Sequence, residues 1–228
     1  MPMDGFLNIL KPPGMSSHDV IGAVRKVLHM KRVGHAGTLD PAAAGVLPIA
    51  VGQAARLIEY LELADKTYRA ELTFGFATDS GDDTGAITEE VADFAMPSQQ
   101  AIEHALLDFT GKIRQTPQAH SAIKIGGKRA CDLLREGKEV EIPSREVTIH
   151  ALDLVAYHPE EKKILLDVQC SKGTYIRSLC LDIGAALGLP ATMSFLVRSR
   201  VGDFALADAL TLEELSEAGE SAILEPAH

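Results

Sequence analysis

Segments with strand-like and helix-like patterns are interspersed along this chain without the regular β–α–β alternation that builds a parallel sheet. Apolar residues at helical spacing predict helices at residues 17–28, 54–61, 98–109 and 174–187, with a capping box at Thr211 opening a short terminal helix. Alternating or apolar runs predict strands at residues 5–10, 46–51, 67–75, 147–157, 164–170 and 194–201. This order of elements favours an α+β fold with a mixed sheet.

The composition suits one globular domain with at most a small appendage. The chain has 228 residues, of which 46% are hydrophobic, so it can bury a core. It contains no apolar run of membrane-spanning length and no secretory signal at its start, so we expect a cytoplasmic protein without membrane attachment. Three cysteines without a C-x-x-C pair argue against a disulfide framework or a zinc ribbon.

The formal net charge of −10 argues against a nucleic-acid ligand until the charges are mapped. Residues 70–111 and 203–228 together hold 16 of the 32 acidic residues and no Lys or Arg, so the rest of the chain sums to +6. Such a basic body with acidic flanks could bind a polyanion on one face. The alternative is an acidic protein whose charges are simply solvated.

Signatures of P-loop NTPases, dinucleotide-binding domains, zincins and α/β-hydrolases are absent from the sequence. The segment 78–85 is too irregular for an EF-hand and is interpreted as an acidic turn. Asp40 stands out because it lies before Pro41 in a loop rich in small residues, where another chain can approach closely. Taken alone, an Asp before Pro usually caps a turn, Tyr68 fits a core position, and Arg177 fits a surface ion pair.

Several segments, in order along nearly the whole chain, resemble the TruB-type tRNA pseudouridine synthases. The matching residues are Lys11-Pro-Pro-Gly-Met-Ser-Ser17, Gly34-His-Ala-Gly-Thr-Leu-Asp-Pro41 with Gly45-Val-Leu-Pro48, Lys66-Thr-Tyr68, Thr78-Asp-Ser-Gly-Asp-Asp-Thr-Gly85, Ser121-Ala-Ile-Lys124, Gly127-Lys-Arg129, Cys170-Ser-Lys-Gly-Thr-Tyr-Ile-Arg177, and Leu196 with Arg198. The resemblance implies the pseudouridine synthase fold, a largely antiparallel mixed sheet flanked by helices, and isomerisation of uridine-55 in the TΨC loop of tRNA.

The resemblance also implies a role for each matching site residue. Asp40 would be the nucleophile, attacking either the uracil ring or the ribose C1′, and Arg177 would pair with it. Tyr68 would stack on the target base and help remove its proton, and Leu196 would pack against that base. His35 would fill the space that the flipped base leaves.

Other matching positions would contact the RNA, and we expect this of Lys11, Lys124, Arg129, Lys172 and Tyr175. The resemblance predicts a catalytic domain over residues 1–202, with an RNA-clasping insertion at about 120–145. Residues 203–228 would form a short acidic helical tail in place of a PUA-type RNA-binding domain, which confines binding to the T-arm. A monomer is expected.

Departures from the family pattern at His120, Cys131 and Val197 leave local RNA contacts there in doubt. The reaction is redox-neutral and uses no water, so we expect neither a cofactor nor a metal. One alternative is a tRNA-binding chaperone without chemistry. Another is a glycosidic hydrolase, which usually needs two carboxylates about 5–9 Å apart; Asp40 alone lies in a convincing loop.

Overall fold

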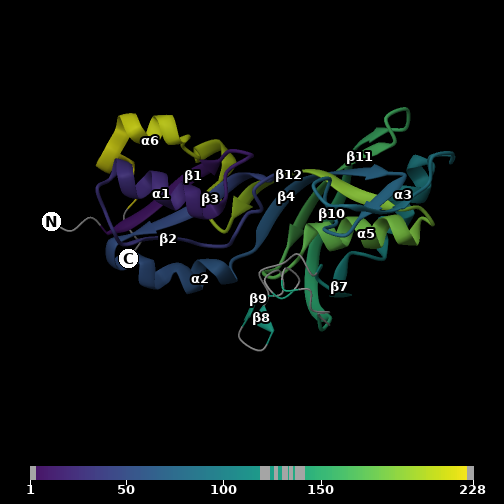
Figure 1. Cartoon of the computed structure of the whole chain (residues 1–228), viewed down its shortest axis with the longest axis horizontal. Coiled ribbons are helices and arrows are strands. Elements are labelled where there is room, and N and C mark those ends of the chain that lie inside the picture. The colour runs from purple at the N-terminus through teal and green to yellow at the C-terminus, as the bar shows by residue number, and fades with distance from the viewer. Residues whose placement is uncertain are drawn as a thin grey trace. The chain divides into compact units, whose positions relative to one another are not determined.

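The computed structural model describes residues 4–118, 124–125, 128–129, 133, 136 and 142–224. The chain divides into two compact units, Met1–Arg69 with Leu196–His228, and Ala70–Phe195. Strands β4 (Lys66–Phe74) and β12 (Ala191–Val201) each run from one unit into the other (Figure 1). We call the two compact units, in the order given, the first unit and the second unit. The expected domain division at residue 202 stays a prediction.

The first unit is built on a mixed sheet. Its strands are β1 (Gly5–Lys11), β2 (Val33–His35), β3 (Ala44–Val51), the second half of β12, and β13 (Phe204–Ala205). β3 pairs antiparallel with β1 and β2, whereas β12 pairs with β3 in parallel, placing Arg198 opposite Gly45. This parallel pair holds the loop before β3 beside β12.

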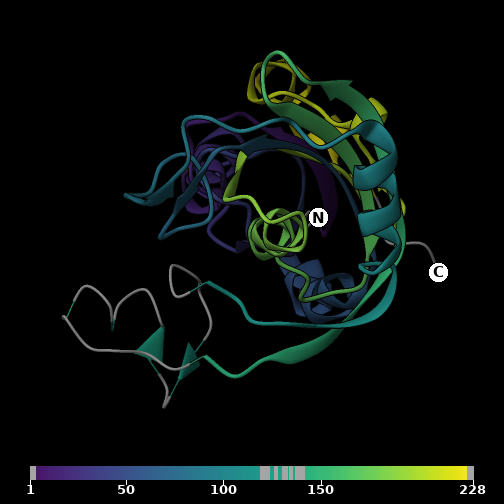
Figure 2. The same cartoon turned by 90° about the vertical axis from the view of Figure 1, so that its right-hand side faces the viewer.

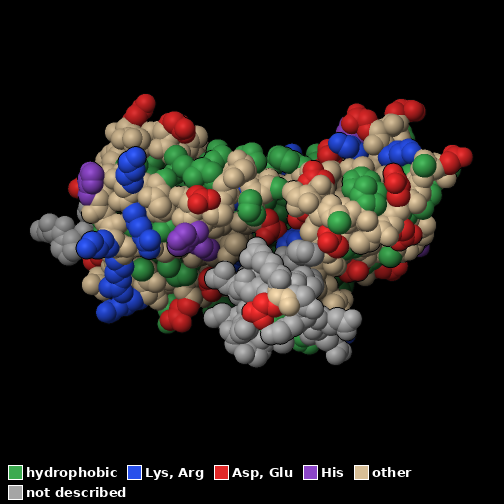
Figure 3. Space-filling model, viewed as in Figure 1, with side chains coloured by type: hydrophobic (Ala, Val, Ile, Leu, Met, Phe, Trp, Pro, Cys, Tyr) green, Lys and Arg blue, Asp and Glu red, His purple; other side chains and the backbone are tan. Residues whose placement is uncertain are grey.

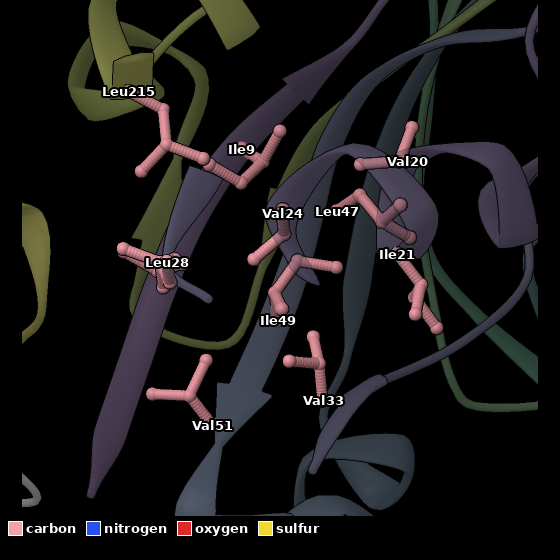
Figure 4. Close-up of a cluster of buried hydrophobic side chains, with 11 residues drawn as sticks. Ile9, Val20, Ile21, Val24, Leu28, Val33, Leu47, Ile49, Val51 and Leu215 are labelled. Atoms are coloured by element: carbon pink, nitrogen blue, oxygen red, sulfur yellow. The ribbon is translucent and has the colours of Figure 1, made fainter. Parts of the chain in front are cut away.

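Helices cover the sheet of the first unit. They are α1 (Ser17–Val27), the 3₁₀ helix η1 (Gly52–Leu57), α2 (Ile58–Leu63), η2 (Leu206–Asp208), α6 (Leu212–Ala218) and η3 (Gly219–Ala222). α1 begins at a capping box between Ser16 and Asp19, which satisfies two free backbone donors. Its apolar face packs on β1 and β3 with Leu215 of α6 (Figure 4). Leu215, in the segment that was expected to be a tail, therefore belongs to this core.

The second unit has strands in the order β4, β11 (Lys163–Cys170), β10 (Arg145–His158) and β7 (Gly111–Gln115). The pairs β10–β11 and β10–β7 are antiparallel. Two hairpins, β5 (Phe76–Thr78) with β6 (Ile87–Glu90) and β8 (Lys124–Ile125) with β9 (Lys128–Arg129), stand apart from this sheet. Helix α3 (Gln99–Leu107) contacts β10 and α5 (Ile176–Ala186) (Figure 2).

The structure confirms the expected α+β class and all six predicted strands, with small shifts at their ends. The predicted helix at 54–61 is instead a 3₁₀ helix followed by α2, and the interpretation of 78–85 as a turn omitted the β5–β6 hairpin around it. Within the part of the chain that the structure describes, no helix is long and apolar enough to cross a membrane. His120 and Cys131 lie outside the described residues.

Candidate active site

The loop that carries Asp40 lies between β2 and β3, and its backbone is held by side chains from other elements. Ser17 of α1 accepts a hydrogen bond from the Leu39 amide (2.9 Å) and donates one to the Leu39 carbonyl (3.0 Å). The Pro41 carbonyl accepts from the Gly14 amide at 2.8 Å. Asp40 is partly exposed, so the loop presents its carboxylate from a fixed backbone.

Arg198 of β12 clamps the same loop from the sheet side. Its side chain is 1% exposed, and it donates from Nε to the Val46 carbonyl at 2.8 Å and from Nη2 to the Gly37 carbonyl at 3.1 Å. A longer contact, 3.5 Å, joins Nη1 to the Thr38 carbonyl. Gly45 lets β12 come this close, because a Cβ there would lie 2.2 Å from the Arg198 carbonyl oxygen. Arg198 belongs to a motif that matches the family, but the sequence alone assigns it no role.

Lys11, at the end of β1, braces the other side of the loop. Its side chain is fully buried, and Nζ donates to the carbonyls of Met15 (2.6 Å), Pro12 (2.9 Å) and Pro41 (3.1 Å). Burial lowers the pKa of Lys11 to about 8, although the charge of Asp40 acts in the opposite direction. Lys11 has no exposed surface in this structure, and its expected contact with RNA stays a prediction.

Three further predicted residues belong to the first unit together with Asp40. Tyr68 on β4 and Leu196 on β12 are 8% and 7% exposed. His35 ends β2 and is half-buried; its Nδ1 is buried without a hydrogen-bond partner among the described atoms. Burial lowers the pKa of His35, and the nearby charge of Arg198 lowers it further. His35 is therefore disposed to stay neutral.

Arg177 lies in the first turn of α5, in the second unit, and is buried. Its Nη1 donates to the Ser80 carbonyl at 2.8 Å and lies 3.6 Å from Oδ2 of Asp82. Asp82 also accepts hydrogen bonds from the hydroxyls of Ser80 (2.8 Å) and Thr84 (2.6 Å). Burial acts to raise the pKa of Asp82, but hydrogen bonds from Thr84 and Ser80, with the charge of Arg177, bring it below its usual value.

Asp82 is a buried neighbour of Arg177 that the sequence alone did not single out. The segment 78–85 was interpreted as an acidic turn, whereas the structure makes Asp82 a buried partner of Arg177. The sequence did hold one indication that Asp82 matters, because Asp82 lies in the segment 78–85, which matches a family motif.

The remaining predicted RNA contacts also lie in the second unit. Lys172 is exposed in the turn before α5, and Tyr175 is the N-cap residue of that helix. Lys124 and Arg129 face each other in the β8–β9 hairpin by their backbones, and their side chains lie outside the described part of the structure.

Exposed cations gather on one surface of the first unit. Figure 3 shows Lys and Arg side chains over the region of α1, where Arg25, Lys26, Lys31 and Arg32 are exposed. We call these four residues the basic patch. The described residues contain no group of three or more His, Cys, Asp or Glu side chains that could hold a metal ion.

Comparison with known proteins places these features in one enzyme class, the pseudouridylate synthases. The profile of the TruB family pseudouridylate synthase N-terminal domain matches residues 25–176, and that of the tRNA pseudouridylate synthase B C-terminal domain matches residues 177–224. The chain belongs to the TruB family.

Curated relatives match over almost the whole chain. The tRNA pseudouridine synthase B of Symbiobacterium thermophilum is 51% identical over 226 residues, which cover 99% of this chain and 75% of the relative. That of Heliobacterium mobile is 52% identical over 95% of this chain and 70% of the relative.

Solved structures support the same fold. A Cbf5-Nop10-Gar1 complex matches with a TM-score of 0.75 at 30% identity, covering 97% of this chain and 60% of that chain. An H/ACA RNP bound to a substrate RNA containing 2'-deoxyuridine matches with a TM-score of 0.69 at 29% identity, covering 93% of this chain and 52% of that one.

Proposed function

We propose that this enzyme converts uridine-55 in the T-loop of tRNA to pseudouridine, with Asp40 as the nucleophile. The relatives at about half identity are named tRNA pseudouridine synthase B, which supports tRNA as the substrate. The observation that carries the assignment of Asp40 is its anchored loop. Ser17, Lys11 and Arg198 hold the backbone on both sides of a partly exposed carboxylate, an arrangement suited to covalent attack.

The reaction rearranges bonds within one nucleotide. The target base leaves its stack, which costs a few kcal/mol. Asp40 attacks the ring or the ribose C1′, the N1–C1′ bond breaks, and the detached uracil turns. A C5–C1′ bond then forms and the bond to Asp40 breaks. A base takes the proton from C5 and N1 takes up a proton, so the product is an isomer of the substrate and the carboxylate is regenerated.

Each remaining residue has a part in this proposal. Tyr68 stacks on the base and helps take the C5 proton, Leu196 packs against the base, and His35 occupies the vacated space. The family resemblance pairs Arg177 with Asp40, and an arginine partner would oppose the neutralisation that burial favours.

The test uses an unmodified tRNA transcript, with pseudouridine mapped at single-nucleotide resolution. We expect product at position 55 with the wild-type protein and none with Asp40→Asn, while tRNA affinity stays within about threefold. Asp203→Asn is the matched control, because Asp203 is an exposed carboxylate of the same unit. Product from Asp40→Asn would refute the nucleophile. If the wild-type protein bound tRNA without forming any product, a chaperone would be indicated. If the wild-type protein released free uracil, a hydrolase would be indicated.

The T-arm is the proposed recognition element, and the basic patch is suited to its phosphates. We propose that a monomer binds one tRNA. A T-arm minihelix should retain kcat/KM within tenfold of full tRNA, a difference of less than about 1.4 kcal/mol. A larger loss would show that recognition extends beyond the T-arm.

A further inference from the structure

The backbone position of Arg177 depends on the turn before α5. The helix does not hold this turn in place by itself. Tyr175 is the N-cap residue of α5 and makes no side-chain capping hydrogen bond. A helix start without a capping side chain leaves backbone donors to be satisfied elsewhere. The position of Arg177, two residues later, therefore depends on contacts that other elements make.

Gln115, the last residue of β7, supplies one of these contacts. Its side chain is fully buried; Oε1 accepts a hydrogen bond from the Tyr175 amide at 2.8 Å, and Nε2 donates to the Tyr175 carbonyl at 2.9 Å. One amide side chain thus satisfies both backbone groups of the N-cap residue, and so holds it in place as a neighbouring strand would.

Arg145, the first residue of β10, supplies a second contact. Its guanidinium lies over the Tyr175 ring, 4.6 Å from the ring centroid, and Nη2 donates to the Gly173 carbonyl. Gly173 has a φ of +82°, a conformation that suits glycine, so the carbonyl is turned toward Arg145 at little backbone cost. A planar guanidinium can stack on the ring and donate to the carbonyl at once.

Arg145 and Gln115 are directly opposite each other in the β7–β10 ladder, so their side chains emerge on the same face of the sheet. The next pair, Glu146 with Arg114, emerges on the other face because side chains alternate along a strand. Arg145 and Gln115, at the end of the β7–β10 ladder, therefore both bind the turn before α5 from the same face of the sheet.

We propose that Arg145 and Gln115 are positioning residues that set the place of the Arg177 guanidinium for pseudouridine formation. This inference rests on the proposed function, in which Arg177 acts on the reacting carboxylate. Neither residue needs to touch the RNA. Their effect should appear in the rate of the chemical step and should depend on the presence of the arginine at position 177.

The experiment is a double-mutant cycle measured under single-turnover conditions with saturating enzyme and a tRNA transcript. Arg145→Lys keeps the charge but loses the planar stack, so we expect the rate to fall about tenfold while the Kd for tRNA stays within about twofold. Arg114→Lys is the matched control on the opposite face and should stay within about twofold in both. In an Arg177→Lys background, Arg145→Lys should reduce the rate by less than about twofold.

A second variant keeps the test decisive if Arg145→Lys fails to fold in a urea titration. Gln115→Met has a similar shape but removes both hydrogen bonds to Tyr175, and it should give the same dependence on Arg177. A full tenfold loss in the Arg177→Lys background would overturn the inference, as would a weaker Kd with an unchanged rate. Absence of product from the wild-type protein would overturn the proposed function and this inference together. The two failures are distinguishable, because in the other two outcomes the wild-type protein still forms product and only this inference fails.

Discussion

Arg198 offers the sharpest test of how the Asp40 loop is held. Arg198→Lys keeps a positive charge, but a single ammonium cannot reproduce a fork that reaches Val46 and Gly37 at 2.8 and 3.1 Å. At least one charge-assisted hydrogen bond is lost, each worth about 1.5–3 kcal/mol. The contact to Thr38 at 3.5 Å adds little. We therefore expect the free energy of unfolding to fall by about 2–4 kcal/mol.

Urea denaturation measures this loss, and the slope m should not change if only the folded state is affected. Because the loop carries Asp40, the single-turnover rate should also fall by more than about tenfold, while tRNA affinity stays within about threefold. Arg200→Lys is the control, since Arg200 is exposed on the same strand and its Nη1 donates to the Gly202 carbonyl over a long 3.5 Å contact. A stability loss below about 0.5 kcal/mol for Arg198→Lys would refute the clamp.

Two further predictions concern the buried charges. The pKa of Lys11 is about 8 in the folded protein against 10.5 for the free side chain, so between these values the unfolded chain holds a proton that the folded protein has released. The free energy of unfolding should therefore rise by up to about 3 kcal/mol from pH 8 to 10.5 in urea titrations, and Lys11→Met should lack this rise. Asp82→Asn should lower the free energy of unfolding by about 1–3 kcal/mol at pH 7 and slow catalysis. Because the pKa of Asp82 is lowered, its stabilising contribution is present at neutral pH and should vanish in acid, as pH falls below its folded pKa.

Local patterns predicted much of the fold. The capping box at Thr211 opens α6 as expected, and β10 and β11 form the antiparallel pair that two adjacent strand-like runs suggest. The patterns did not predict which strands meet across long separations. The parallel pairing of β12 with β3 joins residues 197–198 to 44–45, and no local signal encodes such a contact. The sequence also left open that residues after 202 pack against α1 and β1.

The sequence singled out Asp40 as a candidate site residue but said less about its surroundings. The family motifs proposed the site residues, but not which residues hold others in place. Asp82 looked like one acid of a solvated turn, yet it is buried beside Arg177 because α5 packs against that turn. Gln115 and Arg145 carried no chemical signature, since their role depends on a ladder register that brings them to the start of α5. A side chain that acts by holding backbone is recognisable only once its acceptor is placed.

Four cations in the family motifs are buried and bind backbone in the part of the chain that the structure describes. Those that are buried are Lys11, Lys66, Arg177 and Arg198. Each donates to backbone carbonyls, so none of these charges is free to neutralise a phosphate. The net charge of +6 outside the two acidic segments therefore overstates the charge that is available to RNA. We expect the exposed basic patch to contribute more of the binding.

The salt dependence of tRNA binding separates the two kinds of cation. Each phosphate contact releases about one counterion, so losing one flattens the slope of log Kobs against log salt by slightly less than one. Lys31→Ala should flatten the slope in this way because Lys31 is exposed. Lys11→Met removes a charge of the same kind but from a fully buried position, so its slope should equal that of the wild type even where the protein is less stable. If Lys11→Met flattened the slope as much as Lys31→Ala, Lys11 would contact phosphate after all, and its assignment as an internal brace would be wrong.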